Sequence, residues 1–539
     1  MIWPVEKPTN EADDIPTYAE GTPERKKLLD EFAKIKATTE EIPLIIEGRE
    51  VKTGETINIR SPHKHSRVLA VAHLAGKAEL EAAIEAALAA HETWANLDWY
   101  HRAAIFRKAA DILAGPARIR NIAAIMMNLS KTPFEAEIDL VELVDFWRFN
   151  AYYARFIYEQ QPGQAEAEYN RFDWRPLEGF VLAIPPFNFY SIGGNLPTAP
   201  AIVGNVVLWK PSRPVIWSNY EIMKVLIEAG LPDGVINFVP FSSKHAGTVT
   251  GHRDLAGLHF TGSYETLVTL WKQISQNLET YKNLPRIVGE AGGKDFVFAH
   301  PSADPKSVAV NIIRGGFESQ GQKCSAVSRA YIPESLWPQV KTILLTELPR
   351  VTYGQIEDMK HFMGALINQE AFDKVVSYIE YARGRPEAYE FVFGGHYDEA
   401  AGWFVQPTII RTNQPKGKLA TEEIFGPIVT VYVYPDETYE ETLKLCDTST
   451  PYSLTGAIFA QEREAIAAAE RALQYSAGNF YINDKPTGAI VDRQPFGGAR
   501  SSGTNDKAGS WLNLLRWLSP RTIKETAVPA QDWRRPYQL

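Results

Sequence analysis

The sequence predicts an α/β protein with two or three domains, from its length and from two runs of alternating elements. With 539 residues the chain is too long for one ordinary hydrophobic core. Short apolar strands alternate with helical segments from Phe180 onward, and a second alternation runs from Asp295 to about Asp492. Such alternation is typical of parallel sheets with helices on both faces. The sequence contains no repeat of fixed period and no low-complexity tract.

The part before the first alternation is expected to be an arm followed by helices. Residues 1–40 are polar, charged and interrupted by prolines, which predicts a wrapping arm that ends in a helix. From Lys77, apolar residues recur with the i, i+3, i+4, i+7 spacing of an amphipathic helix. More helices are expected over 103–113, 120–129 and 135–157, and the stretch 160–168 is expected to be an exposed turn.

The two alternations can be divided into elements in order. In the first, strands are expected at 180–184, 205–209, 235–239 and 258–260, and a helix over 215–229 that ends at Gly230. In the second, strands are expected near 296–299, 330–332 and 429–434, with helices near 307–317, 369–382 and 463–472. Ligands bind at the carboxyl ends of parallel strands, where the segments 210–212 and 261–263 fall.

Composition excludes several classes of protein. The net charge of −9 argues against a nucleic-acid partner, and no apolar run is long enough for a membrane span. Two cysteines form no disulfide framework and indicate a reducing compartment. The N-terminus has neither signal-peptide nor transit-peptide character, although a leader that had already been removed would leave no trace in this sequence. The expected compartment is the cytoplasm if the source is bacterial and the mitochondrial matrix if it is eukaryotic. No metal site is evident; His63 and His65 are expected on the surface.

Glu290 and Cys324, 34 residues apart, carry the strongest functional signal. Cys324 lies in the polar, Gly-containing stretch 321–326, where a nearby cation would lower the thiol pKa and favour a nucleophilic thiolate. Glu290 precedes Gly292-Gly293, which suits a base that acts through water. The alternatives are an inert buried cysteine and a surface turn. Cys446 has no such neighbours and is interpreted as structural.

Other candidates have both a functional and an ordinary interpretation. Asn188 could be a locally satisfied turn or an oxyanion donor. Lys210 could be a solvated strand end or a ribose contact, and Gly262-Ser263 opens a helix whose N-terminus suits a pyrophosphate, although no G-x-G-x-x-G is present. Glu423, in the string 422–427, could grip the nicotinamide ribose with Phe425 beside the ring, or could belong to an ordinary acidic turn.

These motifs, in this order, resemble the aldehyde dehydrogenase superfamily, with a match from about Ile57 to Lys524. The resemblance implies Cys324 as nucleophile, Glu290 as general base, and Asn188 with the Cys324 N–H as oxyanion hole. It places the NAD contacts at Lys210, Ser212, Gly262, Ser263, Glu423 and Phe425. The stretches 187–189, 192–196, 205–212, 321–326, 494–500 and 502–507 are similar to the Δ1-pyrroline-5-carboxylate dehydrogenases, which oxidise L-glutamate γ-semialdehyde to L-glutamate in proline breakdown.

The narrower resemblance also implies a substrate site and a domain plan. It implies that Ser325, Gly488 and Ala489 bind the substrate α-carboxylate. Phe189 and Phe496 would enclose its aliphatic chain, and Glu142 would lie near its ammonium end. The expected fold is aldehyde dehydrogenase-like: a Rossmann-type NAD-binding domain (1–164 and 183–292), an α/β catalytic domain (293–516) and a β-strand oligomerisation arm (165–182 and 517–539). The arm predicts a homodimer or larger homo-oligomer, and a proline dehydrogenase is a possible partner.

The sequence departs from the family pattern at two positions, and three alternative functions stay open. Arg213 stands where NAD-preferring members often carry an acid, so NADP is possible beside NAD. Leu267 stands where a second glycine would follow Gly262. The alternatives are a dehydrogenase of another semialdehyde, a CoA-acylating member, which Glu290 disfavours, and a non-catalytic protein on the same scaffold.

Overall fold

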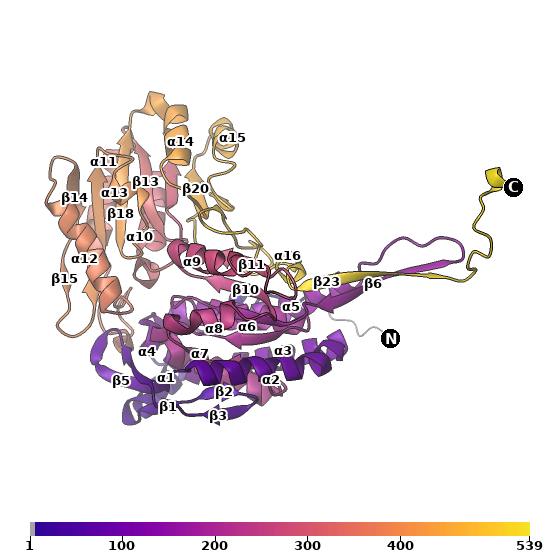
Figure 1. The fold of residues 1–539 in the computed structure, drawn as a ribbon. Coiled ribbons are helices and arrows are strands. Elements are labelled where there is room, and N and C mark those ends of the chain that lie inside the picture. Colours follow the sequence, from indigo (N-terminus) through magenta and orange to yellow (C-terminus); the bar gives the residue numbers. More distant parts are fainter. Residues whose placement is uncertain (1–5) are drawn as a thin grey trace.

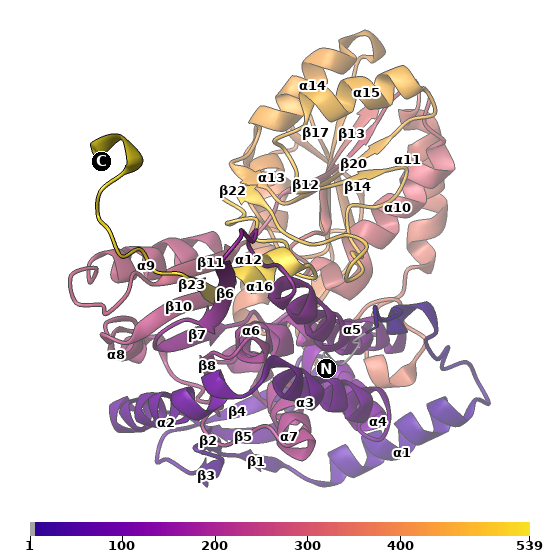
Figure 2. The ribbon, with the colours of Figure 1, turned by 90° about the vertical axis from the view of Figure 1, so that its right-hand side faces the viewer.

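The computed structural model describes residues 6–539 and has two lobes, from which a two-stranded arm projects (Figure 1). Each lobe is built on a seven-stranded sheet, and in a view turned by 90° helices α14 (Tyr439–Thr448) and α15 (Arg463–Ala472) lie at the outer end of the second lobe (Figure 2). The α/β fold expected from the sequence is thus confirmed.

The first lobe has a sheet of parallel central strands with an antiparallel edge. Its order is β11 (Arg286–Glu290), β10 (Leu255–Thr261), β7 (Phe180–Ile184), β8 (Val206–Trp209), β9 (Ile236–Phe238), β2 (Leu44–Ile46) and β3 (Arg49–Val51). The first five strands are parallel, and all four residues of β8 are buried, as expected for a strand covered on both faces.

The helices of this lobe were largely predicted. They are α2 (Lys77–Asn96), α3 (Trp99–Ala114), α4 (Arg118–Leu129), α5 (Pro133–Tyr158), α6 (Tyr190–Ile202), α7 (Ile216–Ala229), α8 (Ala246–Thr250) and α9 (Tyr264–Ser275). The longest, α5, has 26 residues and begins with a capping box between Thr132 and Glu135. α7 ends at Gly230, which adopts φ 92° as the predicted stop requires. α6 was not predicted.

The second lobe has the sheet order β14 (Tyr389–Phe393), β17 (Thr408–Thr412), β18 (Ile428–Tyr434), β13 (Val327–Pro333), β12 (Asp295–Ala299), β20 (Thr455–Phe459) and β21 (Asn479–Ile482). Only β14 runs antiparallel to its neighbour among these pairs. Its longer helices, besides α14 and α15, are α10 (Pro305–Phe317), α11 (Trp337–Glu347) and α12 (Gln369–Arg383). The predicted elements of this region are all present.

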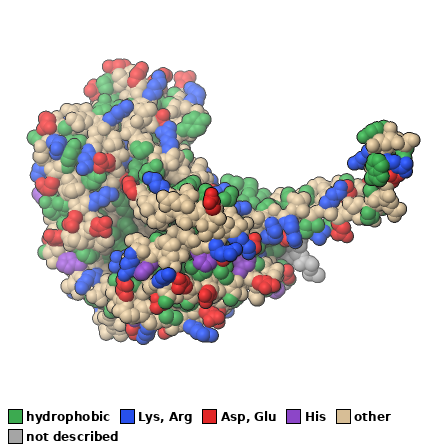
Figure 3. Space-filling view, viewed as in Figure 1, with side chains coloured by type: hydrophobic (Ala, Val, Ile, Leu, Met, Phe, Trp, Pro, Cys, Tyr) green, Lys and Arg blue, Asp and Glu red, His purple; other side chains and the backbone are tan. Residues whose placement is uncertain are grey.

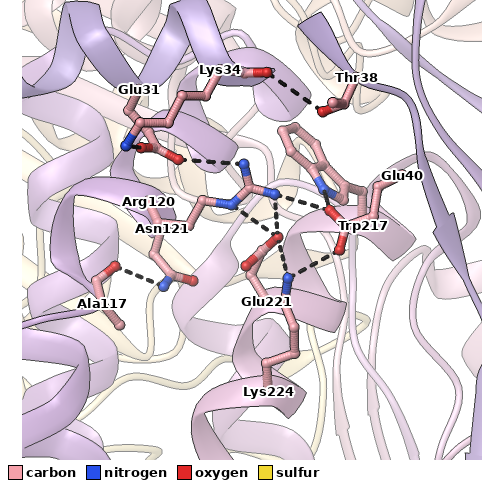
Figure 4. A network of polar contacts seen from close by, with 10 residues as sticks. All are labelled: Glu31, Lys34, Thr38, Glu40, Ala117, Arg120, Asn121, Trp217, Glu221 and Lys224. Atoms are coloured by element: carbon pink, nitrogen blue, oxygen red, sulfur yellow. Dashed lines mark hydrogen bonds and ion pairs between the residues drawn. The ribbon is translucent and has the colours of Figure 1, made fainter. Parts of the chain in front are cut away.

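The N-terminal region wraps onto the first lobe through helix α1 (Pro23–Ala37), as predicted. A polar network joins α1, β1 (Glu40–Ile42), α4 and α7 (Figure 4). At its centre the Arg120 guanidinium contacts Glu221 at 2.8 Å and Glu40 at 2.9 Å. Lys224 and the indole N–H of Trp217 also contact Glu40, at 3.0 and 2.9 Å. The strands β4 (Thr56–Ser61) and β5 (Lys64–His73), which form a three-stranded sheet with β1, were not predicted.

The arm consists of β6 (Glu168–Pro176) and β23 (Leu518–Thr526), paired antiparallel over nine residue pairs. Hydrophobic side chains gather at its tip (Figure 3), where Trp533 and Tyr537 are 83% and 87% exposed. The three-part domain division remains a proposal, with one boundary moved. Phe180 pairs with Val206 in the first sheet, so that sheet includes β7 from its first residue and the arm ends before it.

One expected surface residue is buried. His63 is 0% exposed, and its Nε2 lies 3.2 Å from a carboxylate oxygen of Glu357. The partner is nearly 300 positions away along the chain, so the polar local sequence gave no sign of the burial. His65 is half-buried. Within residues 6–539, no helix has the length and hydropathy needed to cross a membrane, and no cluster of metal-ligating side chains occurs.

Candidate active site

The nucleophile candidate follows a strained turn in the second lobe. The short helix η4 (Glu318–Gly321) precedes Cys324, and Ser319 and Gln320 have left-handed backbones with φ 52° and 59°. The turn is fixed from the first lobe, because the Glu135 carboxylate accepts from the Ser319 N–H and the Gln320 amide donates to the carbonyl of Ser130 at 3.0 Å. Strain of this kind persists only where the surroundings hold it, and it is concentrated at functional sites.

The electrostatics of Cys324 differ from the expectation. Burial raises the pKa of its thiol, and the carboxylates of Asp295, Glu423 and Glu290 raise it further. The nearby cation is already paired, since Lys323 Nζ lies 3.1 Å from Glu318 Oε2. The expected lowering of the thiol pKa is therefore wrong for the unliganded chain. Cys324 rests as a thiol at neutral pH and needs a base to become a nucleophile.

Glu290 is the last residue of β11 and lies beside the nucleophile. Its Oε2 accepts a hydrogen bond from Gly498 N at 3.2 Å, while its buried Oε1 has no partner among residues 6–539. Burial raises the pKa of the Glu290 carboxyl well above its ordinary value. A carboxylate with a raised pKa and a free oxygen is a stronger base than an exposed one.

Asn188 lies between β7 and α6, and its amide is also unsatisfied. It is 7% exposed, and its Nδ2 has no partner among the described residues. Asn188 lines one small cavity together with Ser319 and Gln322, from the segment just before Cys324. The structure thus brings the candidate oxyanion donor and the nucleophile's turn together from the two lobes.

Glu423 and Phe425 adjoin the Gly-rich segment after Glu290. The Gly293 N–H donates to Glu423 Oε1 at 3.0 Å, and a Cβ at Gly292 would collide with the same carboxylate. Burial raises the pKa of Glu423 to about 7. The Phe425 ring meets the Phe187 ring edge-on at 5.6 Å, directly before Asn188. These contacts bring Glu423 and Phe425 to the catalytic group.

The remaining cofactor candidates follow strands of the first sheet. Lys210, after β8, has a pKa lowered to about 8 by burial, and its Nζ lies 5.5 Å from the Phe241 ring centroid with no acidic partner in the described chain. Ser212, two residues on, is half-buried. Gly262 donates its N–H to the carbonyl of Glu290 at 3.1 Å and packs so closely on Phe260 that a Cβ would clash.

These positions fit a dinucleotide. Ser263 caps α9 by accepting from the Thr266 N–H at 3.2 Å and is exposed, so the helix N-terminus is open to a phosphate. Lys210 is half-buried, and a largely desolvated ammonium without an acid nearby is satisfied by oxygen acceptors such as ribose hydroxyls. Leu267, which stands in place of a second glycine, is 4% exposed and packs on Gly289, so it supports the sheet rather than the open helix end.

The substrate candidates come from three segments: the region of α5 and α6, the residue after Cys324, and the loop 487–496. Ser325 Oγ and Thr487 Oγ1 are 2.8 Å apart and buried, beside Gly488, which has φ 93°. Phe496 is half-buried, and its backbone pairs with Ala508 just before the glycines that contact Glu290. Burial raises the pKa of Glu142 to about 7, and its Oε2 accepts from Ser191 Oγ at 2.6 Å. Ala489 is half-buried in the same loop, and Phe189 lies under the Lys131 ammonium, 4.2 Å from ring centroid to Nζ.

Sequence reasoning gave no role to several buried groups around the site. Lys294 is 1% exposed, its Nζ has no partner among residues 6–539, and burial lowers its pKa to about 7. Lys294 lies in the stretch 290–294 that the sequence analysis singled out. Its position directly before an apolar strand was the signal that could have predicted its burial. Lys131 and Asp139 gave no signal, because the contacts that set them apart are made to residues 189–191 at the start of α6.

Comparison with known proteins identifies the family. Residues 49–523 match the sequence profile of the aldehyde dehydrogenase family. The chain belongs to the aldehyde dehydrogenase family. It is 48% identical over 537 residues to the mitochondrial Δ1-pyrroline-5-carboxylate dehydrogenase of Dictyostelium discoideum, covering 99% of this chain and 96% of that protein. The corresponding human protein is 47% identical over 528 residues, with 97% and 94% covered.

Solved structures agree with this family membership. The Δ1-pyrroline-5-carboxylate dehydrogenase of Mycobacterium tuberculosis bound with NAD superposes with a TM-score of 0.96 at 49% identity, covering 100% of this chain and 99% of that chain. The Thermus enzyme with bound NAD gives a TM-score of 0.90 at 31% identity, with 97% and 99% covered. The aldehyde dehydrogenase-like fold is therefore confirmed along the whole chain.

Proposed function

We propose that this chain is an NAD-dependent Δ1-pyrroline-5-carboxylate dehydrogenase, which oxidises L-glutamate γ-semialdehyde to L-glutamate in the second step of proline catabolism. The full-length similarity to enzymes of that name supports the activity and the substrate. The observation that carries the chemistry is the arrangement of Cys324, Glu290 and Asn188. The Glu290 carboxylate is close enough to raise the pKa of the Cys324 thiol, Asn188 lines a small cavity with the turn before Cys324, and Glu290 Oε1 and Asn188 Nδ2 have no partner among residues 6–539.

Cys324 attacks the aldehyde carbon, and Glu290 is the base. The raised pKa of Glu290 makes its free Oε1 a suitable acceptor for the thiol proton. Once that proton has passed to solvent, the same carboxylate can accept a proton from the water that hydrolyses the thioester, and the Cys324 sulfur is the leaving group. Asn188 Nδ2 and the Cys324 N–H stabilise the oxyanion of the thiohemiacetal. A preorganised donor of this kind contributes on the order of 3 kcal/mol to the transition state.

NAD, when bound, supplies the acceptor for the hydride of the thiohemiacetal. Lys210, Ser212 and Glu423 would hold its riboses, Gly262 and Ser263 would hold its pyrophosphate, and Phe425 would lie beside the nicotinamide. Arg213 follows Ser212 and is exposed, and an arginine here could accept the 2′-phosphate of NADP. The test therefore compares NAD with NADP.

The substrate residues would recognise an amino-acid aldehyde. The hydroxyl of Ser325 and the backbone N–H groups of Gly488 and Ala489 suit the α-carboxylate. Phe189 and Phe496 enclose the aliphatic chain, and Glu142 faces the ammonium end. The exposed arm supports a homodimer or larger homo-oligomer, and a proline dehydrogenase remains a possible partner. The proposed compartment is the cytoplasm in a bacterium and the mitochondrial matrix in a eukaryote.

Steady-state formation of NADH tests the proposal. The enzyme is assayed with Δ1-pyrroline-5-carboxylate, succinate semialdehyde and propanal, with NAD or NADP, and beside the Cys324→Ala variant. We expect the pyrroline with NAD to give by far the highest kcat/KM and the variant to be inactive. A higher kcat/KM with another aldehyde would overturn the substrate, and turnover by the variant would overturn the mechanism.

A further inference from the structure

Helix α6 begins without a capping side chain at the most sensitive point of the site. Phe189 occupies its N-cap position and makes no side-chain cap. The first N–H groups of a helix have no partners within the helix, and Ser, Thr, Asp or Asn usually satisfies one of them. Here the position is taken by the proposed aromatic clamp, directly after Asn188. The cap must therefore come from another element.

Asp139 of helix α5 supplies that cap. Its carboxylate accepts from the Tyr190 N–H at 2.9 Å through Oδ2 and from the Ser191 N–H at 3.0 Å through Oδ1. The side chain is 1% exposed. One carboxylate thus satisfies two N–H groups in the first turn of α6, from a helix that is itself rigidly packed in the core.

Lys131 completes the arrangement. Its Nζ lies 2.6 Å from Asp139 Oδ2 and 4.2 Å from the centroid of the Phe189 ring, and its side chain is 4% exposed. A charge as buried as Asp139 is tolerated when it is paired and hydrogen-bonded. Lys131 follows Ser130, whose Oγ accepts from the Ala365 N–H of the second lobe at 2.9 Å. The pair is therefore anchored on both sides of the site.

We propose that the buried Lys131–Asp139 pair positions Asn188 and Phe189 for catalysis. The inference rests on the proposed roles of these two residues. The Asn188 amide has no partner of its own among residues 6–539, so its direction depends on the backbone that Asp139 fixes two residues later. A misplacement of about 1 Å at a reacting group costs on the order of 100-fold in rate. Lys131 and Asp139 are thus positioning residues that act through their neighbours.

The first measurement compares Asp139→Asn with Glu137→Gln, two carboxamide variants on the same helix. Glu137 is also buried and paired, with Arg118 at 2.7 Å, but it faces the N-terminal arm. We expect Asp139→Asn to lower kcat about 100-fold with a smaller rise in KM. Alkylation of Cys324 by iodoacetamide should keep its rate, because that reaction needs no oxyanion donor. Glu137→Gln should lower Tm and keep kcat.

A double-mutant cycle with Asn188→Ala decides whether Asp139 acts through Asn188. We expect the double variant to be no slower than Asn188→Ala alone. Multiplying losses, or an Asp139→Asn enzyme with full kcat, would overturn the inference and leave the proposed function intact. Full kcat in Asn188→Ala would overturn the role of Asn188 and the inference with it. If Asp139→Asn does not fold, Lys131→Met/Asp139→Asn, which buries no unpaired charge, takes its place.

Discussion

Two polar regions of the first lobe and its border, one partly exposed and one buried, are built in opposite ways. In the network around Arg120, every charged group drawn in Figure 4 has a partner, and Glu221, 3% exposed, meets both Arg120 and Lys224 at 2.8 Å. At the active site, by contrast, Asn188 Nδ2, Glu290 Oε1 and Lys294 Nζ are buried and have no partner among residues 6–539.

The difference separates groups that hold the fold from groups kept for a reaction. A buried polar atom without a hydrogen bond costs about 1–3 kcal/mol, so a chain retains one where substrate, cofactor or water completes it. The Arg120 network satisfies its charges and joins the adjacent elements α1 and β1 to the more distant helices α4 and α7. Substitutions in the network should therefore reduce stability, and substitutions at the site should reduce turnover. The predictions below test this division.

Cys324→Ala should have the largest effect on turnover. Loss of the nucleophile should lower kcat by at least about 10⁴-fold, because no second thiol lies at the site. The free energy of unfolding should change by less than about 1 kcal/mol, since no hydrogen bond is lost. NADH formation and thermal unfolding measure the two quantities. Cys446→Ala is the matched control: that thiol is buried in the second lobe, so the variant should keep kcat and lose stability.

Glu290→Gln should lower kcat by about 10²–10⁴-fold, the usual contribution of a general base, and should raise stability at alkaline pH. The pKa of Glu290 is raised in the folded state, so the folded protein binds its proton more tightly than the unfolded chain. The stability that this proton contributes is present below the unfolded pKa and is lost as pH rises through the folded value. The variant should therefore exceed the native Tm at pH 8, by a margin that shrinks toward pH 5. A difference in Tm between variant and native protein that stays the same from pH 8 to pH 5 would contradict the raised pKa of Glu290.

Much of the fold could be predicted, because periodicity is a local signal. The strand 180–184 and the helix 463–472 have the expected bounds. Helix α6 was missed because Pro197 and Pro200 lie inside it and Gly193 and Gly194 in its first turns, a composition that disfavours helix. Packing decides here: twelve of its residues are buried. The strands before Lys77 were also missed, although β2 pairs with β3 and β4 with β5 nearby in the sequence; the pairing of β2 with β9 is the remote contact.

The candidate site was predicted in its residues and not in its electrostatics. The motifs named Cys324, Glu290 and Asn188, whose roles stay a proposal; in the structure Glu290 acts on the pKa of Cys324, and Asn188 shares a cavity with the turn before Cys324. The raised pKa of Cys324 could not be inferred, since it depends on desolvation and on Asp295 and Glu423, which reach the thiol only through the tertiary fold. The role of the Lys131–Asp139 pair could not be predicted for the same reason, because Asp139 accepts hydrogen bonds from N–H groups of another helix, α6.

Arg120→Met should show the reverse of the site variants. Removing the guanidinium takes one of two cations from the buried Glu221 and one from Glu40. Because the arginine is 31% exposed and Lys224 remains, we expect a loss of about 2 kcal/mol, below the full cost of breaking a buried pair. Urea unfolding measures the loss, and kcat at 25 °C should stay within about twofold of the native value. A large fall in kcat with little loss of stability would remove the distinction between the two regions.

Glu142 lies between the two cases, because its Oε2 is hydrogen-bonded to Ser191 although we propose that the residue binds the substrate ammonium. Burial raises its pKa to about 7. If the ionised carboxylate binds the substrate ammonium, kcat/KM should fall about tenfold from pH 8 to pH 6 as the carboxyl takes up its proton. Glu142→Gln should lack this dependence, and the ratio of native to variant kcat/KM cancels the pH-dependent ring opening of the substrate. A ratio that is constant across this range would assign Glu142 to the structural class, as a hydrogen-bond acceptor that supports α6.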